Sequence, residues 1–263
     1  MPLLLVGFSL VLLATPAALT PPKGLACLVR FYGGKAVPSK TGWQYALPNG
    51  VEVPYDDGRE KTLDEKDADA DPEDMYFVRY RKGVIRPVKD PDDDPGRVRF
   101  DALFRATYGD SASRVDLVSV TFAGHRVRVH RKIQKPFERA ALRVDAVLRA
   151  DPTLEKYVHT LAGTFNWRNI AGTERLSSHS FGIAIDLDTR FSNYWRWQKA
   201  GTPWAWKNSM PQSIVDAFEA EGFIWGGRWY HFDTMHFEYR PELLDPSCEE
   251  GAGSLNGTSP DGN

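Results

Sequence analysis

The chain has 263 residues, with 33 lysines and arginines against 35 aspartates and glutamates, and a formal net charge of -2. With 42% hydrophobic residues and only two cysteines, the composition is that of a globular protein and excludes collagen-like, wholly disordered and disulfide-scaffold proteins. Because positive and negative side chains balance, the protein has no overall positive charge to attract a nucleic-acid duplex. We therefore expect no nucleic-acid partner. The length suffices for one large domain or two small ones.

Residues 1–20 carry no charged side chain, and an apolar run from Leu3 to Leu13 is followed by small residues around Pro16. This pattern is typical of a secretory signal peptide and predicts a periplasmic or secreted protein. Because no basic residue precedes the run, an uncleaved membrane anchor is the alternative. We expect membrane contact only through this segment.

The two cysteines, Cys27 and Cys248, lie near opposite ends of the mature chain. In an exported protein they can form a disulfide that closes a long loop. Two buried free thiols are the alternative, and Cys27 also stands in a weak match to a lipidation motif. The polar, glycine-rich residues 246–263 predict a disordered tail.

Residues 21–110 are expected to form an N-terminal extension that wraps the next domain. Alternation of apolar and polar residues around turn signals predicts short strands or an extended wrapping arm over 23–55. Residues 56–74 contain ten acidic and three basic side chains, which predicts a solvated and poorly packed acidic connector.

Residues 111–245 are expected to form the main domain. Two alternating runs, 115–122 and 126–129, predict a β-hairpin. Apolar residues at helical spacing predict helices over 136–149 and 209–221. For the second helix, Ser209 and Gln212 are expected to form a capping box.

The segment SSHSFGIAIDLD, residues 177–188, offers two candidate metal ligands. Gly182 permits a tight turn after His179, and the apolar residues that follow predict a buried strand that carries Asp186. A buried carboxylate is costly unless it is paired or binds a metal. His179 and Asp186 are therefore candidates for a metal site.

The segment GFIWGGRWYHFDTMHFE, residues 222–238, offers a third ligand. If residues 235–239 form a strand, His236 and Glu238 share one face, and Asp233 lies in the loop that enters it. Two histidines and one aspartate leave a position open, as in catalytic zinc sites. Asp233 then supplies a free carboxylate as a general base.

The pattern His-x6-Asp, followed about fifty residues later by Asp-x-x-His, resembles that of the VanY-like zinc D-Ala-D-Ala carboxypeptidases and L-alanyl-D-glutamate endopeptidases. These are relatives of the hedgehog and lysostaphin-type zinc folds. The resemblance covers about residues 163–241. It implies one zinc ion per chain, bound by His179, Asp186 and His236, with Asp233 as the catalytic base.

In this family an arginine upstream of the first zinc ligand holds a carbonyl or carboxylate of the substrate. Arg168 is our candidate for this role, because a guanidinium grips such oxygens and stabilises developing negative charge. Arg175 is the nearer alternative. His231 and Glu238 are expected to orient the ligand rings or the substrate.

The resemblance implies a zinc metallopeptidase that hydrolyses peptidoglycan stem peptides, either at the terminal D-Ala or within the stem. A non-catalytic zinc-containing cell-wall binding module is the alternative, and the presence of Asp233 argues against it. A third hypothesis is a wall-binding protein that recognises glycan through its aromatic residues, since seven of eight tryptophans lie within residues 167–229.

The expected fold class is α+β. We predict a small antiparallel sheet that carries Asp186 and His236, helices that flank it, and a zinc site in a groove on the sheet.

Overall fold

The computed structural model describes residues 20–248. Nearly all of the predicted signal peptide and residues 249–263 of the predicted tail lie outside the described residues. Within residues 20–248, no helix is both long and apolar enough to cross a membrane.

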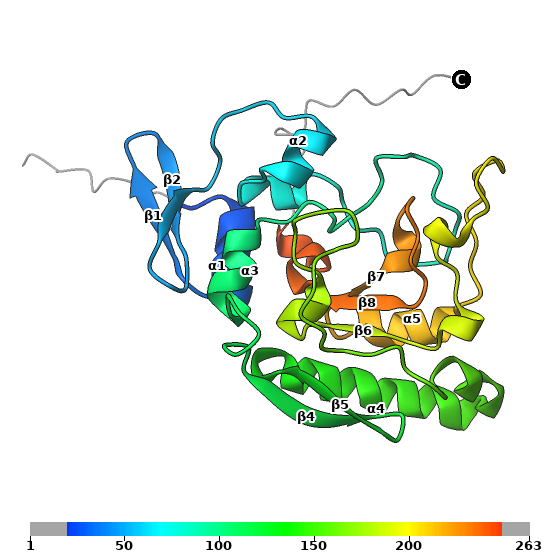
Figure 1. Ribbon diagram of the computed structural model, residues 1–263. Helices are drawn as coiled ribbons and strands as arrows, with labels where there is room; N and C mark the ends of the chain where they lie inside the picture. Colours follow the sequence, from blue (N-terminus) through cyan, green and yellow to red (C-terminus); the bar gives the residue numbers. More distant parts are fainter. Residues whose placement is uncertain (1–19, 249–263) are drawn as a thin grey trace, which may run out of the picture.

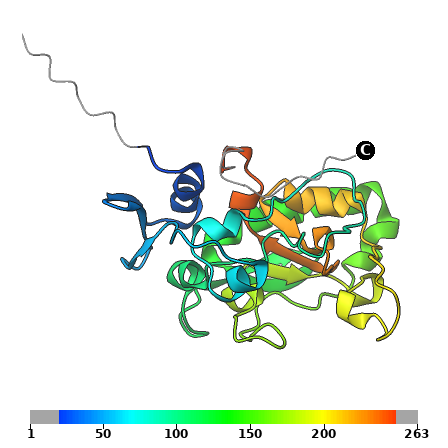
Figure 2. The same cartoon turned by 90° about the horizontal axis from the view of Figure 1, so that it is seen from above.

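The N-terminal part begins with helix α1 (Lys23–Tyr32) and an antiparallel sheet of β1 (Lys35–Ser39), β2 (Gly42–Ala46) and β3 (Glu52–Pro54). Two short helices follow, α2 (Leu63–Ala68) and α3 (Asp101–Tyr108). The sheet of β1 to β3 projects to one side of the molecule (Figures 1 and 2). This part of the chain therefore places its helices, and not its sheet, near the remaining elements.

The predicted hairpin is confirmed, with β4 (Leu117–Phe122) antiparallel to β5 (His125–His130). Ala123 and Gly124 form its turn with φ of 46° and 79°. Positive φ at both positions is the geometry of the tight turn that matches strand twist. The helix predicted over 136–149 is confirmed as α4 (Gln134–Ala150), which packs against the hairpin.

The central sheet is antiparallel, in the order β6 (Ala184–Asp186), β8 (His236–Tyr239) and β7 (Phe223–Trp225). Helix α5 (Gln212–Glu219) packs against α4 and β7. Small antiparallel sheets flanked by helices confirm the predicted α+β class (Figure 1).

Aromatic rings join these layers into one core. Phe122 of the hairpin lies 5.8 Å from Phe137 of α4 and 5.7 Å from Phe218 of α5, measured between ring centroids. Phe218 in turn stacks on Phe237 of the central sheet at 4.1 Å. All four side chains are at most 1% exposed, so burial of apolar surface fixes the central sheet relative to the helices.

Two local predictions are wrong. Residues 23–32 form a helix and not strands, because Leu25, Leu28 and Tyr32 recur at helical spacing and are buried on one face. The capping box of α5 is absent, because Pro211, and not Ser209, is the N-cap residue of the helix. Gln212 instead accepts a hydrogen bond from the Ile85 amide at 2.7 Å.

The acidic connector is exposed over residues 56–60, as expected, but part of it is packed, contrary to the expectation from its composition. The ammonium group of Lys61 lies 2.8 Å from Asp74 and 3.2 Å from Asp71, and Lys66 also pairs with Asp74. All four residues are buried. Pairing of opposite charges offsets the cost of removing them from water, an effect that a count of acidic residues does not reveal.

The N-terminal part is fastened to the last residues of the described chain. Cys27 and Cys248 form a disulfide, which settles the alternatives of free or lipidated thiols. Arg30 pairs with Asp245 at 2.6 Å, and the Tyr32 hydroxyl donates to Glu242 at 2.6 Å. Helix α1 is therefore held to the chain just after β8.

We expect the double variant Cys27→Ser/Cys248→Ser to lower the free energy of unfolding by about 2–5 kcal/mol, because the bond closes a loop of 221 residues in the unfolded chain. Urea titrations of the native and double-variant proteins measure this difference. The wild type treated with reductant should match the variant. Equal midpoints for the oxidised and variant proteins would contradict the expectation.

Candidate metal centre

The central sheet brings two predicted ligands together through its register. Asp186 of β6 and His236 of β8 are direct cross-strand partners, and Ala184 is the partner of Glu238. Side chains of such partners lie on the same face of the sheet, close together. The pairing of β6 with β8 thus joins residues that are fifty positions apart in the chain.

A tight turn supplies the third predicted ligand. Residues Ser178–Phe181 form a 3₁₀ turn, and the Ser177 hydroxyl accepts a hydrogen bond from the His179 amide. Gly182 ends the turn with φ of 67°, and a Cβ atom there would lie 2.8 Å from Leu117 and 3.0 Å from the His130 amide. Glycine is therefore required both by its conformation and by the close approach of the hairpin.

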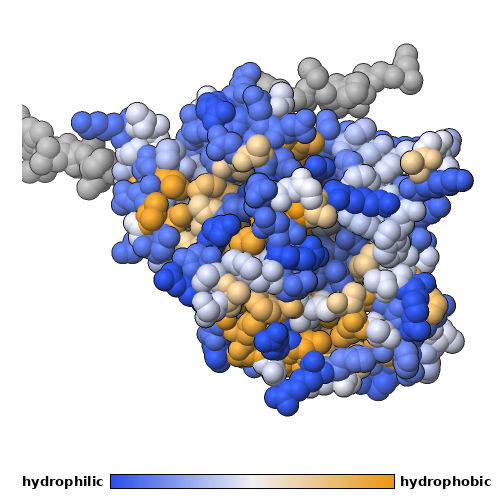
Figure 3. Space-filling view, viewed as in Figure 1, coloured by the Kyte–Doolittle hydropathy of each residue, from blue (hydrophilic) through white to orange (hydrophobic). Residues whose placement is uncertain are grey.

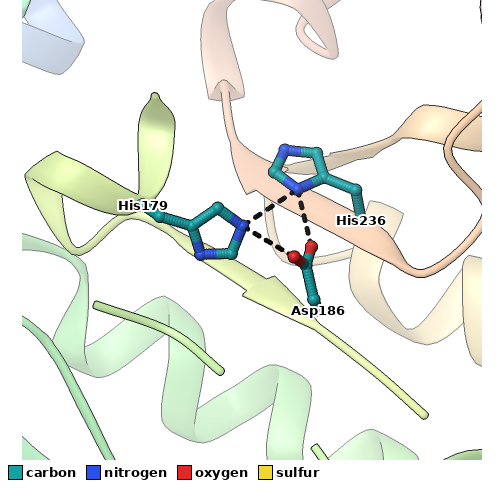
Figure 4. Close-up of side chains that lie close together, drawn as sticks. All are labelled: His179, Asp186 and His236. Carbon is teal, nitrogen blue, oxygen red and sulfur yellow. Dashed lines mark hydrogen bonds and ion pairs between the residues drawn. The ribbon is translucent and has the colours of Figure 1, made fainter. Parts of the chain in front are cut away.

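The three side chains converge on one point (Figure 4). His179 Nε2 lies 3.1 Å from Asp186 Oδ2 and 3.2 Å from His236 Nδ1. His236 Nδ1 lies 2.8 Å from Asp186 Oδ1. Two nitrogens and a carboxylate, contributed by a turn and two strands, face one another.

The outer nitrogens of both rings are held by neighbouring groups. His179 Nδ1 lies 2.7 Å from the carbonyl oxygen of Thr164, which can only accept a hydrogen bond. His236 Nε2 lies 3.1 Å from a carboxylate oxygen of Glu238. These partners favour a proton on each outer nitrogen and direct His179 Nε2 and His236 Nδ1 toward the centre.

Burial and neighbouring charges shift the pKa values of the group. Burial alone would raise the pKa of Asp186, but His179 and His236 hold it well below its usual range. Burial alone would lower the pKa of His236, but the carboxylates of Asp186 and Glu238 raise it well above 6.5. The arrangement therefore favours positive charge between the carboxylates.

A chain of buried charges continues away from this centre. Arg240 is fully buried, 3.3 Å from Glu238 and 2.6 Å from Glu242. Burial would raise the pKa of Glu238, but His236 and Arg240 hold it well below its usual range. Glu238 therefore stays ionised and can hold the ring of His236.

Asp233 lies beside the three residues in the loop before β8. Its amide donates to the Gly226 carbonyl at 3.0 Å, and a Cβ atom on Gly226 would lie 2.5 Å from the Asp233 carbonyl oxygen. Burial, and then the negative charge of Asp186, raise the pKa of Asp233 to about 7. Its Oδ1 atom is buried without a hydrogen-bond partner among the described residues.

The donor set fits a zinc ion. The ligand atoms of His179, Asp186 and His236 all lie within 4.8 Å of one another, and the ligands of tetrahedral zinc lie roughly 3.3 Å apart. The side chain of Asp186 is 19% exposed, so the group is not sealed from solvent. The partnerless oxygen of Asp233 is a second sign that a ligand belongs here, since buried polar atoms rarely lack a partner.

The other predicted residues lie in different surroundings. Arg168 is exposed and lies on a loop. Its carbonyl oxygen accepts a hydrogen bond from the Ser180 hydroxyl at 2.8 Å, and its amide donates one to the same hydroxyl at 2.9 Å. Arg175 pairs with Asp67 and donates to the Arg97 carbonyl, so its guanidinium is engaged by the N-terminal part.

His231 does not contact the three residues of the candidate metal centre. Its ring lies 2.6 Å from Asp94 and packs 4.8 Å from the ring of Trp195. Glu238, in contrast, contacts His236 directly, as predicted.

Sequence reasoning missed Arg240, Glu242 and Tyr32. The alternation Glu238-x-Arg240-x-Glu242 is a detectable signal, since side chains at every second position of an extended segment share one face and opposite charges there can pair. The link to Tyr32 lies 210 positions away and leaves no local signal.

We expect Arg240→Met to lower the free energy of unfolding by about 3–5 kcal/mol, because it leaves Glu238 and Glu242 buried without their cation. Urea denaturation measures the change. As a matched control, Arg114→Met breaks an ion pair whose side chains are 72% and 50% exposed and should cost less than about 1 kcal/mol. Equal losses of unfolding free energy in the two variants would show that the buried ion pairs stabilise the fold no more than an exposed pair does.

Residues 171–239 match the family model described as D-alanyl-D-alanine carboxypeptidase. The matched segment is about a quarter of the chain and contains His179, Asp186, Asp233 and His236, whereas Arg168 lies just before it. No solved structure matches the chain at a significant level. The match confirms the resemblance seen in the sequence: residues 171–239 are similar to the D-alanyl-D-alanine carboxypeptidase family, the VanY-like family.

Proposed function

We propose that the chain is a zinc-dependent peptidase that hydrolyses peptide bonds in peptidoglycan stem peptides, as a D-Ala-D-Ala carboxypeptidase or an L-Ala-D-Glu endopeptidase. The observation that carries this proposal is the convergence of His179, Asp186 and His236 beside a buried carboxylate oxygen of Asp233 that has no partner among the described residues. The family match supports the peptidase class, and the substrate follows from the match by analogy.

His179, Asp186 and His236 would hold the ion, through the atoms that face one another in Figure 4. When bound, zinc polarises a carbonyl group and makes a water molecule a better nucleophile at neutral pH. Glu238 and the Thr164 carbonyl hold the two rings from outside. The ligands are thereby oriented before the ion arrives, which reduces the ordering that binding requires.

Asp233 is positioned to move the proton. Its Oδ1 accepts a proton from the attacking water, whose oxygen forms a bond to the carbonyl carbon. When the carbon–nitrogen bond breaks, the same carboxyl group returns the proton to the departing amine. A pKa of about 7 suits a group that must both accept and donate a proton near neutral pH.

Arg168 would bind a carboxylate or carbonyl oxygen of the substrate. Its guanidinium makes one long hydrogen bond, 3.4 Å to the Asn169 carbonyl, and so retains donors for a ligand. Ser180, one residue after His179, holds its backbone.

We propose a periplasmic or secreted location. The disulfide between Cys27 and Cys248 supports this, because such bonds form and persist in oxidising compartments.

The test is the metal content and activity of purified protein. We expect about one zinc ion per chain by mass spectrometry of the metal, lost in His236→Ala and kept in His159→Ala, whose histidine is exposed. Asp233→Asn should keep zinc but lower turnover of stem peptides by about 10²–10⁴-fold, the usual contribution of a general acid–base group. The products show which bond is cut.

Two results would overturn the proposal in different ways. Zinc bound by His236, with no cleavage of any stem peptide by the native protein, would favour the non-catalytic cell-wall binding module. A native protein without zinc after purification and dialysis against zinc would remove the metal centre itself.

A further inference from the structure

A loop next to Asp233 presents exposed aromatic rings. Residues 187–211 join β6 to α5 without a strand of their own. The loop is fastened to the segment that carries Asp233: the Trp195 amide donates to the Phe232 carbonyl at 2.9 Å, and Tyr194 forms a β-bridge with Asp233. The position of this loop is therefore coupled to that of the proposed catalytic base.

The rings of this loop pack in a continuous series with Tyr230, which lies in the loop between β7 and β8. The series, which we call the aromatic face, consists of Tyr194, Trp195, Trp197, Trp204 and Tyr230. Trp204 stacks on Tyr230 with 4.4 Å between centroids and 15° between planes. Trp197 meets Tyr194 edge-on at 5.8 Å. Mutual packing holds the rings in fixed orientations.

The outer members of the aromatic face remain open to solvent. Trp197 is 57% exposed and Trp204 is 37% exposed. Large apolar rings are normally buried, and a group of exposed ones marks a binding surface. The backbone links the series to the candidate metal centre: Trp229, next in sequence to Tyr230, lies 5.7 Å from the ring of His236.

The composition of the loop limits the class of partner that the aromatic face can bind. From residue 189 to 215 there is no acidic side chain and there are four basic ones, of which Arg196 lies over the Trp195 ring. From 192 to 209 there is also no Leu, Ile, Val, Phe or Met. In Figure 3 the surface over this segment, which is yellow in Figure 1, is mostly pale with projecting blue groups.

We propose that the aromatic face binds the glycan strand of peptidoglycan, so that the enzyme acts on stem peptides still attached to the polymer. This inference rests on the proposed function and specifies its substrate. The C–H face of a pyranose ring carries partial positive charge and stacks on the negative face of an aromatic ring. The basic side chains complement the carboxylates that stem peptides carry.

A lipid surface is the competing partner for exposed tryptophans. Loops and helices that enter a bilayer combine aromatic rings with aliphatic side chains that reach the hydrocarbon. Residues 192–209 lack the aliphatic part, and their rings pack against one another instead of projecting singly. The observations therefore favour a sugar polymer.

The experiment compares two substrates and two variants. We expect Trp197→Ala and Trp204→Ala to lower kcat/KM on intact peptidoglycan about tenfold, and to leave kcat/KM on a free stem pentapeptide within about twofold. Leu142→Ala, which removes a 67% exposed apolar side chain from α4, is the control and should change neither. Equal losses on both substrates, or no loss on the polymer, would overturn the inference.

A binding measurement separates this inference from the proposed function. Tetra-N-acetylchitotetraose should quench the tryptophan fluorescence of the native protein, less in Trp204→Ala and unchanged in Leu142→Ala. If neither substrate is cut but the sugar binds in this way, the proposed activity fails and the glycan face stands. Binding to vesicles of anionic phospholipid without binding to the sugar would assign the face to a membrane and overturn the inference.

Discussion

The imidazole of His236, held between the carboxylates of Asp186 and Glu238 at 2.8 and 3.1 Å, is the contact on which the rest of the site depends. Each carboxylate is costly to bury alone, and each is satisfied by the opposite edge of the same ring. The β6–β8 register fixes one contact and the i, i+2 spacing within β8 fixes the other. A change in strand register would break both at once.

The chain of charges behind this ring explains why the N-terminal part matters to the site. Glu238 contacts Arg240, Arg240 contacts Glu242, and Glu242 accepts a hydrogen bond from Tyr32 of helix α1. Buried ion pairs seldom add net stability compared with apolar residues. Their effect here is orientation, because an ionised and immobile Glu238 holds the ring in one position. Helix α1 thus completes a network that ends at the candidate metal centre.

The sequence predicted the parts of this arrangement that depend on short-range pattern. Turn, strand and spacing signals made His179, Asp186 and His236 candidates, the family resemblance joined them into one site, and the structure brings them together. Periodicity located α4 and the hairpin. Helix α1 was missed because alternation and helical spacing overlap in a short apolar segment. The ion pairs of Asp74 and the contact of Tyr32 with Glu242 were missed because they join residues that only the fold makes neighbours.

The loop that holds Asp233 joins the proposed catalytic base and part of the aromatic face in one piece of backbone. Gly226 leaves room for the Asp233 carbonyl and accepts a hydrogen bond from the Asp233 amide. Between them in sequence lie Trp229, beside His236, and Tyr230, beneath Trp204. A side chain at position 226 would displace the carboxylate and the aromatic rings together. The two glycines of Gly226–Gly227 are therefore required by close packing, and this packing fixes the position of Asp233 relative to Trp229.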